Sequence, residues 1–198
     1  MATKRRGALP SVVIAGRPNV GKSTLFNRIT RSRKAIVTMT PGTTRDLVAE
    51  DAEWCGVSFR LVDSGGIFGA SDDPLELKVL ERGQLGIDSA DVIVFVVDAR
   101  EGLVPPDQAV ADLVRKVGVP VVLAVNKLDV RRARNRGLEF FQLGFDLITE
   151  VSAEHGTGTG DLLDVVVRLL QNKRPSGRSL SSSGVKTADE LKETAVAI

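Results

Sequence analysis

The sequence predicts a three-layer α/β fold on a mostly parallel six-stranded sheet with one antiparallel edge strand. Short apolar runs alternate along the chain with helical patterns, and such alternation is typical of a parallel sheet covered by helices. The apolar runs are residues 11–15, 48–54, 57–62, 91–97, 119–125 and 147–151, and the helical patterns lie around 22–30, 74–88, 106–117, 134–142 and 160–171. Only Cys55 and Gly56 separate the second and third runs, so we expect these two strands to form the antiparallel edge pair.

The composition fits one domain of ordinary size. The chain has 198 residues and a net charge of +2, and so small a net charge gives no overall field that requires a nucleic-acid partner. The single cysteine, Cys55, cannot form an internal disulfide. We find no signal peptide or membrane-spanning run, because the apolar runs have only the length of strands. The sequence therefore predicts a cytoplasmic protein.

The first apolar run leads into a phosphate-binding loop. Residues 16–23 read Gly-Arg-Pro-Asn-Val-Gly-Lys-Ser, which matches G-x-x-x-x-G-K-[ST] between a strand and a helix. The glycines let backbone N–H groups point at phosphate oxygens, and the helix adds its positive N-terminal end. We expect Lys22 to reach the β- and γ-phosphates and the Ser23 hydroxyl to bind Mg²⁺. The nucleotide-binding residues predicted here are Gly16, Arg17, Pro18, Asn19, Val20, Gly21, Lys22, Ser23 and Thr24.

Two later motifs are expected to respond to the γ-phosphate. The sequence Asp-Ser-Gly-Gly begins at Asp63, which would hold Mg²⁺ through a water, while the N–H of Gly66 would contact the γ-phosphate. The segment 40–46, Thr-Pro-Gly-Thr-Thr-Arg-Asp, offers a hydroxyl that completes the Mg²⁺ shell, and we prefer Thr44 to Thr43. Loss of the γ-phosphate would release both segments, which is an order–disorder switch.

The motif Asn-Lys-Leu-Asp at residues 126–129 indicates the base. Asp129 is placed to accept hydrogen bonds from N1–H and the 2-amino group of guanine, which adenine lacks. An unpaired buried carboxylate costs a few kcal/mol, so we expect a preference of roughly a hundredfold. Asn126 is expected to tie this loop to the base and to the phosphate loop, and the Lys127 stem to cover the ring. The motif follows the run 119–125, at the strand end where open α/β sheets bind ligands.

A third segment extends the predicted base site. Ser152, Ala153 and Glu154 follow the last apolar run, and we expect the N–H of Ala153 to meet the guanine 6-oxygen. The alternative is a helix-capping turn before the glycines of 156–160. The position of the segment after the 126–129 motif favours base recognition.

The residue that orients the attacking water is not evident. In Ras-type GTPases a glutamine after the D-x-x-G motif does this, but the chain has Ile67 there, which forms no side-chain hydrogen bond. The Asn19 carbonyl is a candidate ligand for a monovalent cation beside the phosphates; the alternative is that Asn19 satisfies local backbone groups. Arg45 is a further candidate for phosphate contact. The predicted catalytic residues are Lys22, Asn19, Thr44 and Gly66, and the predicted metal ligands are Ser23, Thr44 and Asp63.

These motifs, in this order, identify the chain as a member of the P-loop GTPase superfamily, and further stretches resemble the N-terminal GTPase domain of the Der/EngA family. The stretches are residues 16–27, 40–46, 63–67, 90–98, 101–103 and 152–156. The resemblance covers about residues 10–172. The chain departs from the family pattern at Met39, Thr43 and Ser64, and none of these changes removes a metal or phosphate ligand.

The resemblance implies a GTP-hydrolysing switch in assembly of the large ribosomal subunit. It implies Mg²⁺ and K⁺ as cofactors and the ribosome and ribosomal RNA as partners. Der/EngA proteins carry two GTPase domains in tandem and then a KH-like domain. Accordingly we expect residues 1–10 to be a flexible basic arm, 11–171 the GTPase domain, and 172–198 a linker leading into a second, missing GTPase domain. The last five residues, Thr-Ala-Val-Ala-Ile, are mostly apolar like 11–15, although a disordered tail is the alternative.

Other functions remain open from sequence alone. Ile67 would also suit a nucleotide-gated binding module with little hydrolysis, and the Thr43–Thr44 pair also resembles Era-like and tRNA-modifying GTPases. An ATP-dependent kinase or ATPase is opposed by Asp129. The arginines between residues 131 and 136 are either a solvated face or a contact for RNA phosphates.

Overall fold

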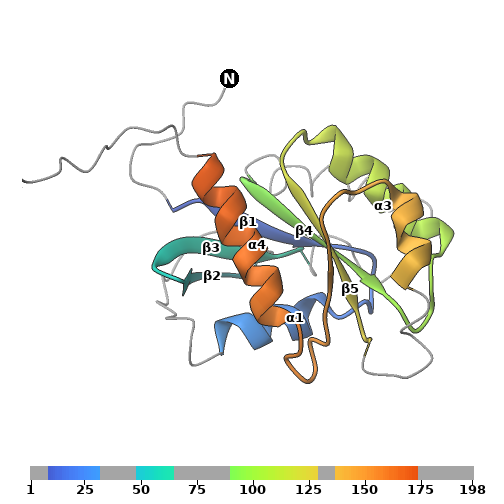
Figure 1. Ribbon diagram of the computed structural model, residues 1–198, viewed down its shortest axis with the longest axis horizontal. Helices are drawn as coiled ribbons and strands as arrows, with labels where there is room; N and C mark the ends of the chain where they lie inside the picture. Colours follow the sequence, from blue (N-terminus) through green and yellow to red (C-terminus); the bar gives the residue numbers. More distant parts are fainter. Residues whose placement is uncertain (1–8, 32–47, 65–89, 129–136, 174–198) are drawn as a thin grey trace, which may run out of the picture.

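The protein is built on a six-stranded sheet with the strand order β2-β3-β1-β4-β5-β6. The computed structural model describes residues 9–31, 48–64, 90–128 and 137–173 (Figure 1). The strands are β1 Ser11–Ala15, β2 Val48–Trp54, β3 Val57–Asp63, β4 Val92–Asp98, β5 Val121–Asn126 and β6 Ile148–Glu150. All neighbouring strands are parallel except β2 and β3. The predicted sheet, with its antiparallel edge strand, is confirmed.

A two-residue turn joins the antiparallel pair. Cys55 and Gly56 have φ values of +49° and +75°, and Trp54 pairs with Val57 directly beside the turn. Positive φ at both central residues gives a turn whose twist matches the flanking strands. The short spacer between the two apolar runs therefore forms the tight hairpin that the sequence predicts.

Helices cover both faces of the sheet (Figure 1). Along each strand the side chains alternate between the faces, so even-numbered residues of β1 and β4 pack with α1 and α4, and odd-numbered residues pack with α3. The helices are α1 Lys22–Thr30, α3 Pro105–Lys116 and α4 Thr159–Asn172, and η3 Gly137–Leu143 is a 3₁₀ helix on the α3 face. This arrangement is the three-layer fold.

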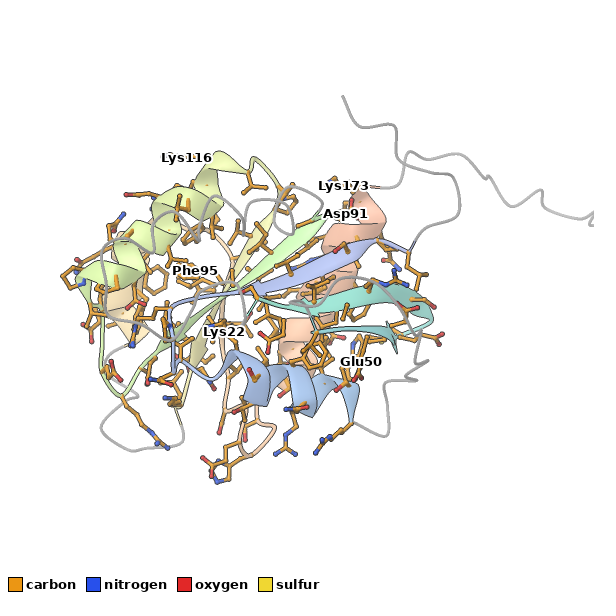
Figure 2. The ribbon with its side chains drawn as sticks, turned by 180° about the vertical axis from the view of Figure 1, so that it is seen from behind. Lys22, Glu50, Asp91, Phe95, Lys116 and Lys173 are labelled. Carbon is orange, nitrogen blue, oxygen red and sulfur yellow. The ribbon has the colours of Figure 1, made fainter. Side chains whose placement is uncertain are left out.

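Strand β4 is buried along its whole length, because it lies inside the sheet with a helical layer on each side. A strand with two covered faces reads as a continuous apolar run rather than an alternating one. Phe95 faces the α3 layer (Figure 2), where its ring contacts Phe145 edge-on at 5.7 Å between centroids. Strand β4 thus lies between β1 and β5 and is packed from both faces of the sheet.

The segment predicted as a helix around 134–142 is a 3₁₀ helix in its described part. Phe140 and Leu143 are fully buried, and residues three apart eclipse each other in a 3₁₀ helix, so both reach the core together. Residues 134–136 and the helical pattern at 74–88 lie outside the described residues, as do most of the predicted arm and the segment after 173. Within the described ranges, none of the helices has the length and apolar character to cross a membrane.

Candidate functional site

The carboxyl ends of the parallel strands gather the predicted site residues at one edge of the sheet. β1 runs into the phosphate loop, β3 ends at Asp63, β4 at Asp98 and β5 at Asn126. Asp63 is in register with the end of β1, and Asp98 with Asn126. Open α/β sheets bind ligands at this edge. Motifs that are far apart in the sequence therefore meet here.

Two glycines in the phosphate loop allow contacts that other residues would block. Gly16 has φ +150°, and a Cβ there would lie 2.4 Å from the Val96 carbonyl oxygen. Gly21 has φ +100°, and its Cβ would lie 2.4 Å from the Asn126 amide nitrogen. No side chain caps α1 at Gly21, and the N-terminal end of a helix favours an anion. The loop is shaped by backbone and suits phosphate.

Lys22 is a buried ammonium group at the start of α1 (Figure 2). Lys22 is only 5% exposed to solvent, and its Nζ donates a hydrogen bond to the Arg17 carbonyl at 2.7 Å. Burial lowers the pKa of Lys22 to about 8, with Asp63 raising the pKa and Arg17 lowering it. A phosphate group would supply the negative charge that this buried site favours.

Asn126 joins the phosphate loop to the base loop. Its Nδ2 donates to the Val20 carbonyl at 2.8 Å, and its Oδ1 accepts the N–H of Ala153 at 2.9 Å. The link to the phosphate loop agrees with the expectation for Asn126. The N–H of Ala153, which we expected at the guanine 6-oxygen, has a protein partner in this structure, so a nucleotide would have to share or replace that partner.

Lys127 is held from two sides in a left-handed conformation, with φ +67°. Its Nζ donates to the Asn19 carbonyl at 2.7 Å and to the Asp98 carboxylate at 2.6 Å. Strained φ values of this kind persist where the surroundings fix them, as they do at functional sites. Sequence reasoning gave Asp98 no role. The sequence feature that could have indicated a role for Asp98 is a carboxylate at the last position of an apolar run, as Asn126 is at the end of the next strand.

A pocket of about 250 Å³ opens between these loops. It brings together residues from three of the predicted motifs, and adds Arg100, which we did not predict. The lining residues are Gly21, Thr24, Arg100, Asn126, Lys127, Ser152, Ala153 and Glu154. Arg100 lies two residues after Asp98, the last residue of β4, and its N–H donates to the Asp98 carboxylate at 2.9 Å. The predicted base-recognition residues that the structure describes thus line one cavity.

The side chain of Arg17 points to α3 and not into this pocket. Its Nε lies 3.0 Å from Asp107 Oδ1, and its Nη2 lies 2.8 Å from Glu101 Oε2. The Asp107 side chain is fully buried and also accepts the N–H of Val104 at 3.2 Å. Burial raises the pKa of Asp107, while the Val104 N–H and Arg17 lower it. The predicted contact of Arg17 with a nucleotide stays a prediction, and with its side chain on Asp107 and Glu101 we expect that contact to come from the backbone.

Two predicted metal ligands lie at this edge. Ser23 is in the first turn of α1, and Asp63 is buried, 6% exposed, at the end of β3. A hydroxyl and a carboxylate are oxygen donors of the kind Mg²⁺ prefers, so the residues present fit that ion. Thr44, Gly66, Ile67 and Asp129 lie outside the described residues, as do Arg45 and the basic segment 131–136.

Comparison with known proteins gives one family over most of the sheet. Residues 11–127 match the family described as 50S ribosome-binding GTPase. The chain is similar to the GTPase Der of Symbiobacterium thermophilum, with 52% identity over 81% of this chain and 34% of that protein. It is similar to the GTPase Der of Moorella thermoacetica at 51% identity, over 81% and 37% of the two chains.

A solved structure shares the fold as well. Era in complex with MgGDPNP and nucleotides 1506–1542 of 16S ribosomal RNA is 28% identical, with a TM-score of 0.63 over 87% of this chain and 59% of that one. The chain spans about a third of the length of the curated relatives that it matches. The comparisons therefore concern the GTPase domain of these relatives. The strand order given above is that of a P-loop GTPase fold.

Proposed function

Because the chain belongs to the family of 50S ribosome-binding GTPases, we propose that it binds GTP and GDP, hydrolyses GTP, and acts as a switch in assembly of the large ribosomal subunit. The observation that carries the proposal is the pair of hydrogen bonds made by the Asn126 side chain, one to the Val20 carbonyl and one from the Ala153 N–H. It makes a phosphate loop and a base loop into one pocket. Such a pocket suits a nucleoside phosphate and not a phosphate alone.

The proposed chemistry is in-line attack of water on the γ-phosphate. Lys22 and the backbone N–H groups of the phosphate loop stabilise the charge that develops on the phosphoryl oxygens. Asp129 selects guanine, and the Lys127 stem covers the ring while its ammonium stays on Asp98 and Asn19. Gly66 responds to the γ-phosphate. Loss of that phosphate then releases the segments that carry Thr44 and Gly66.

Two cations belong to this proposal. Ser23, Thr44 and Asp63 would hold Mg²⁺, which neutralises phosphate charge when bound. The Asn19 side chain is exposed at the edge of the phosphate loop, and it is our candidate ligand for K⁺. Since Ile67 cannot orient water, a second positive charge beside the phosphates would replace the one that an arginine supplies in other GTPases.

The partners are proposed from the relatives. The ribosome and ribosomal RNA are supported by the family description and by the Era structure, which contains 16S ribosomal RNA. A second GTPase domain and a KH-like domain would account for the other two thirds of the relatives' length. The cytoplasm is the compartment where such a protein would meet ribosomal subunits.

GTP turnover tests the proposal. We expect this chain to hydrolyse GTP with Mg²⁺ and to do so at least about fivefold faster in potassium chloride than in sodium chloride at equal ionic strength. Asn19→Ala should lose that potassium stimulation and retain GDP binding. Tight GTP binding with negligible turnover in both salts would contradict the enzymatic part and favour a nucleotide-gated binding module, the function that Ile67 also allows.

A further inference from the structure

Arg28, near the end of α1, contacts the loop between β6 and α4. Its Nε donates to the Ala153 carbonyl at 3.0 Å, and its Nη2 donates to the Glu154 carbonyl. Its stem lies over Gly156, where an added Cβ would be 3.5 Å from Arg28 Cδ. In Figure 1 the orange loop before α4 lies beside α1. Two hydrogen bonds thus join the helix that follows the phosphate loop to the loop before α4.

The same loop is held from its other side by Asn126. Asn126 accepts the N–H of Ala153, and Arg28 binds the carbonyl of the same residue, so both peptide groups that flank Ala153 are fixed. In a trans peptide the C=O and the following N–H point in opposite directions. Binding of the Ala153 carbonyl by α1 therefore directs the Glu154 N–H away from α1. Both Ala153 and Glu154 line the nucleotide pocket.

We propose that Arg28 is a positioning residue for guanine recognition, acting through the backbone of Ala153 and Glu154. By holding the Ala153 carbonyl it sets the direction in which the loop presents the N–H of Glu154 to the 6-oxygen of guanine, and its bond to the Glu154 carbonyl holds the next peptide group. This inference rests on the proposed guanine-nucleotide function. Because Lys22 and Ser23 lie on the same helix as Arg28, the proposed role of Arg28 also links the phosphate-binding end of α1 to the loop that contacts the base.

The guanidinium group is suited to this role. It has several donors in a fixed planar fork and can bind two neighbouring carbonyls at once. A lysine has one ammonium on a flexible stem and would not fix both peptide planes. Arg28 is exposed, so its removal should leave the core intact. Arg31, which follows the C-terminal end of the same helix, provides a control for loss of one positive charge.

The test compares GDP with 6-thio-GDP at pH 7 by titration calorimetry on the full 198-residue chain. Sulfur at position 6 accepts hydrogen bonds weakly and leaves N1–H and the 2-amino group in place. We expect Arg28→Met to weaken GDP binding about tenfold, as two charged-donor hydrogen bonds allow. It should weaken 6-thio-GDP binding less than about threefold, because the contact that Arg28 positions is already weak there. Arg31→Met should change neither affinity.

Arg28→Gln, which keeps one donor, should give an intermediate loss for GDP. Equal losses for both nucleotides in Arg28→Met would overturn the proposal, since they would mean a general effect on the fold or the pocket. An unchanged GDP affinity would overturn it too. Failure of the unaltered chain to bind GDP, or equal binding of ADP, would instead contradict the proposed function, so the two failures are distinguishable.

Discussion

At the scale of single residues, Lys22 connects the folding of this chain to its ligand. The pKa of Lys22 falls from 10.5 to about 8, chiefly through burial. That difference corresponds to about 3 kcal/mol against the charged form in the nucleotide-free chain. Burial of the Lys22 ammonium therefore lowers the free energy of unfolding of the nucleotide-free chain. A bound phosphate would stabilise the ammonium and raise the pKa of Lys22 again.

This reversal predicts a proton uptake. Near pH 8.5 much of Lys22 is neutral in the free chain, and GDP binding should restore its charge, so roughly half a proton or more should be taken up per GDP. At pH 7 the uptake should be near zero. Calorimetry in buffers of different ionisation enthalpy measures it, and Lys22→Met supplies the control. Equal uptake at both pH values would contradict the buried-ammonium account.

The same shift predicts how stability depends on pH without nucleotide. Between about pH 8 and 10.5 the unfolded chain binds more protons at Lys22 than the folded chain does. Stability should therefore rise through this interval relative to Lys22→Met. Below pH 8 Lys22 is charged in both the folded and the unfolded chain, so the destabilisation by its burial is fully present. Urea unfolding at pH 7 and pH 10 compares the two chains, and a difference that does not change with pH would oppose the prediction.

Gly21 controls the link between the phosphate and base loops. Gly21→Ala would combine a left-handed φ with a Cβ 2.4 Å from the Asn126 amide, so Asn126 would move and GDP affinity should fall at least about tenfold. Gly118→Ala is the matched control, because Gly118 has φ +70° and no atom within 4 Å of the added Cβ. Gly118→Ala should reduce stability by about 1 kcal/mol and leave GDP affinity unchanged.

Residue types were predictable wherever a motif encodes local geometry. The phosphate loop, Asn126 and the Ser152–Glu154 segment could be placed at one edge because each follows a strand. The contacts that fix them could not: Arg17 and Asp107 are 90 positions apart, and Arg28 and Ala153 are 125 apart. Such ion pairs and side chain–carbonyl bonds depend on tertiary packing that leaves no periodic trace in the sequence.

At the scale of elements, the pair Arg17–Asp107 ties the phosphate loop to the start of α3. Asp107 is fully buried and Arg17 is 11% exposed, so the pair is shielded from solvent. Arg17→Met would leave a buried carboxylate without its guanidinium partner and should cost about 3 kcal/mol at neutral pH. Arg60→Met, which breaks an exposed cross-strand pair with Asp51, should cost about 1 kcal/mol or less.

The loss of stability in Arg17→Met should also depend on pH. Burial already raises the pKa of Asp107, and removal of Arg17 would raise it further, so the variant's folded state should hold its proton to higher pH than the unfolded state. Relative to the unaltered chain, Arg17→Met should therefore lose stability as pH rises from about 4 to 8. Urea unfolding at pH 5 and pH 8 checks this. A larger destabilisation at pH 5 would contradict it.

The sheet was easier to predict than the helical layer beside it. Runs bounded by turn residues marked all six strands, and they are most apolar in β4 and β5, where burial on both faces demands it. The 3₁₀ helix η3 was harder, since Phe140 and Leu143 at a spacing of three fit an α-helical pattern equally well. Its Leu138 and Phe141 remain exposed, which no amphipathic pattern would indicate.

At the scale of the molecule, the loops that follow β4 and β5 come together because these two strands are parallel neighbours inside the sheet. Buried β4 and β5 bring Asp98 and Asn126 side by side, and the loops at their ends share one pocket with the phosphate loop. We infer that this pocket is selective for guanine nucleotides. It depends on the whole arrangement rather than on any one motif.

Calorimetric titration of the nucleotide-free chain with GDP and with ADP, both with Mg²⁺, tests that claim most directly. We expect GDP to bind at least about a hundredfold more tightly than ADP, and Asp129→Asn to remove most of the difference. Equal affinities for the two nucleotides, or no binding of GDP, would contradict it.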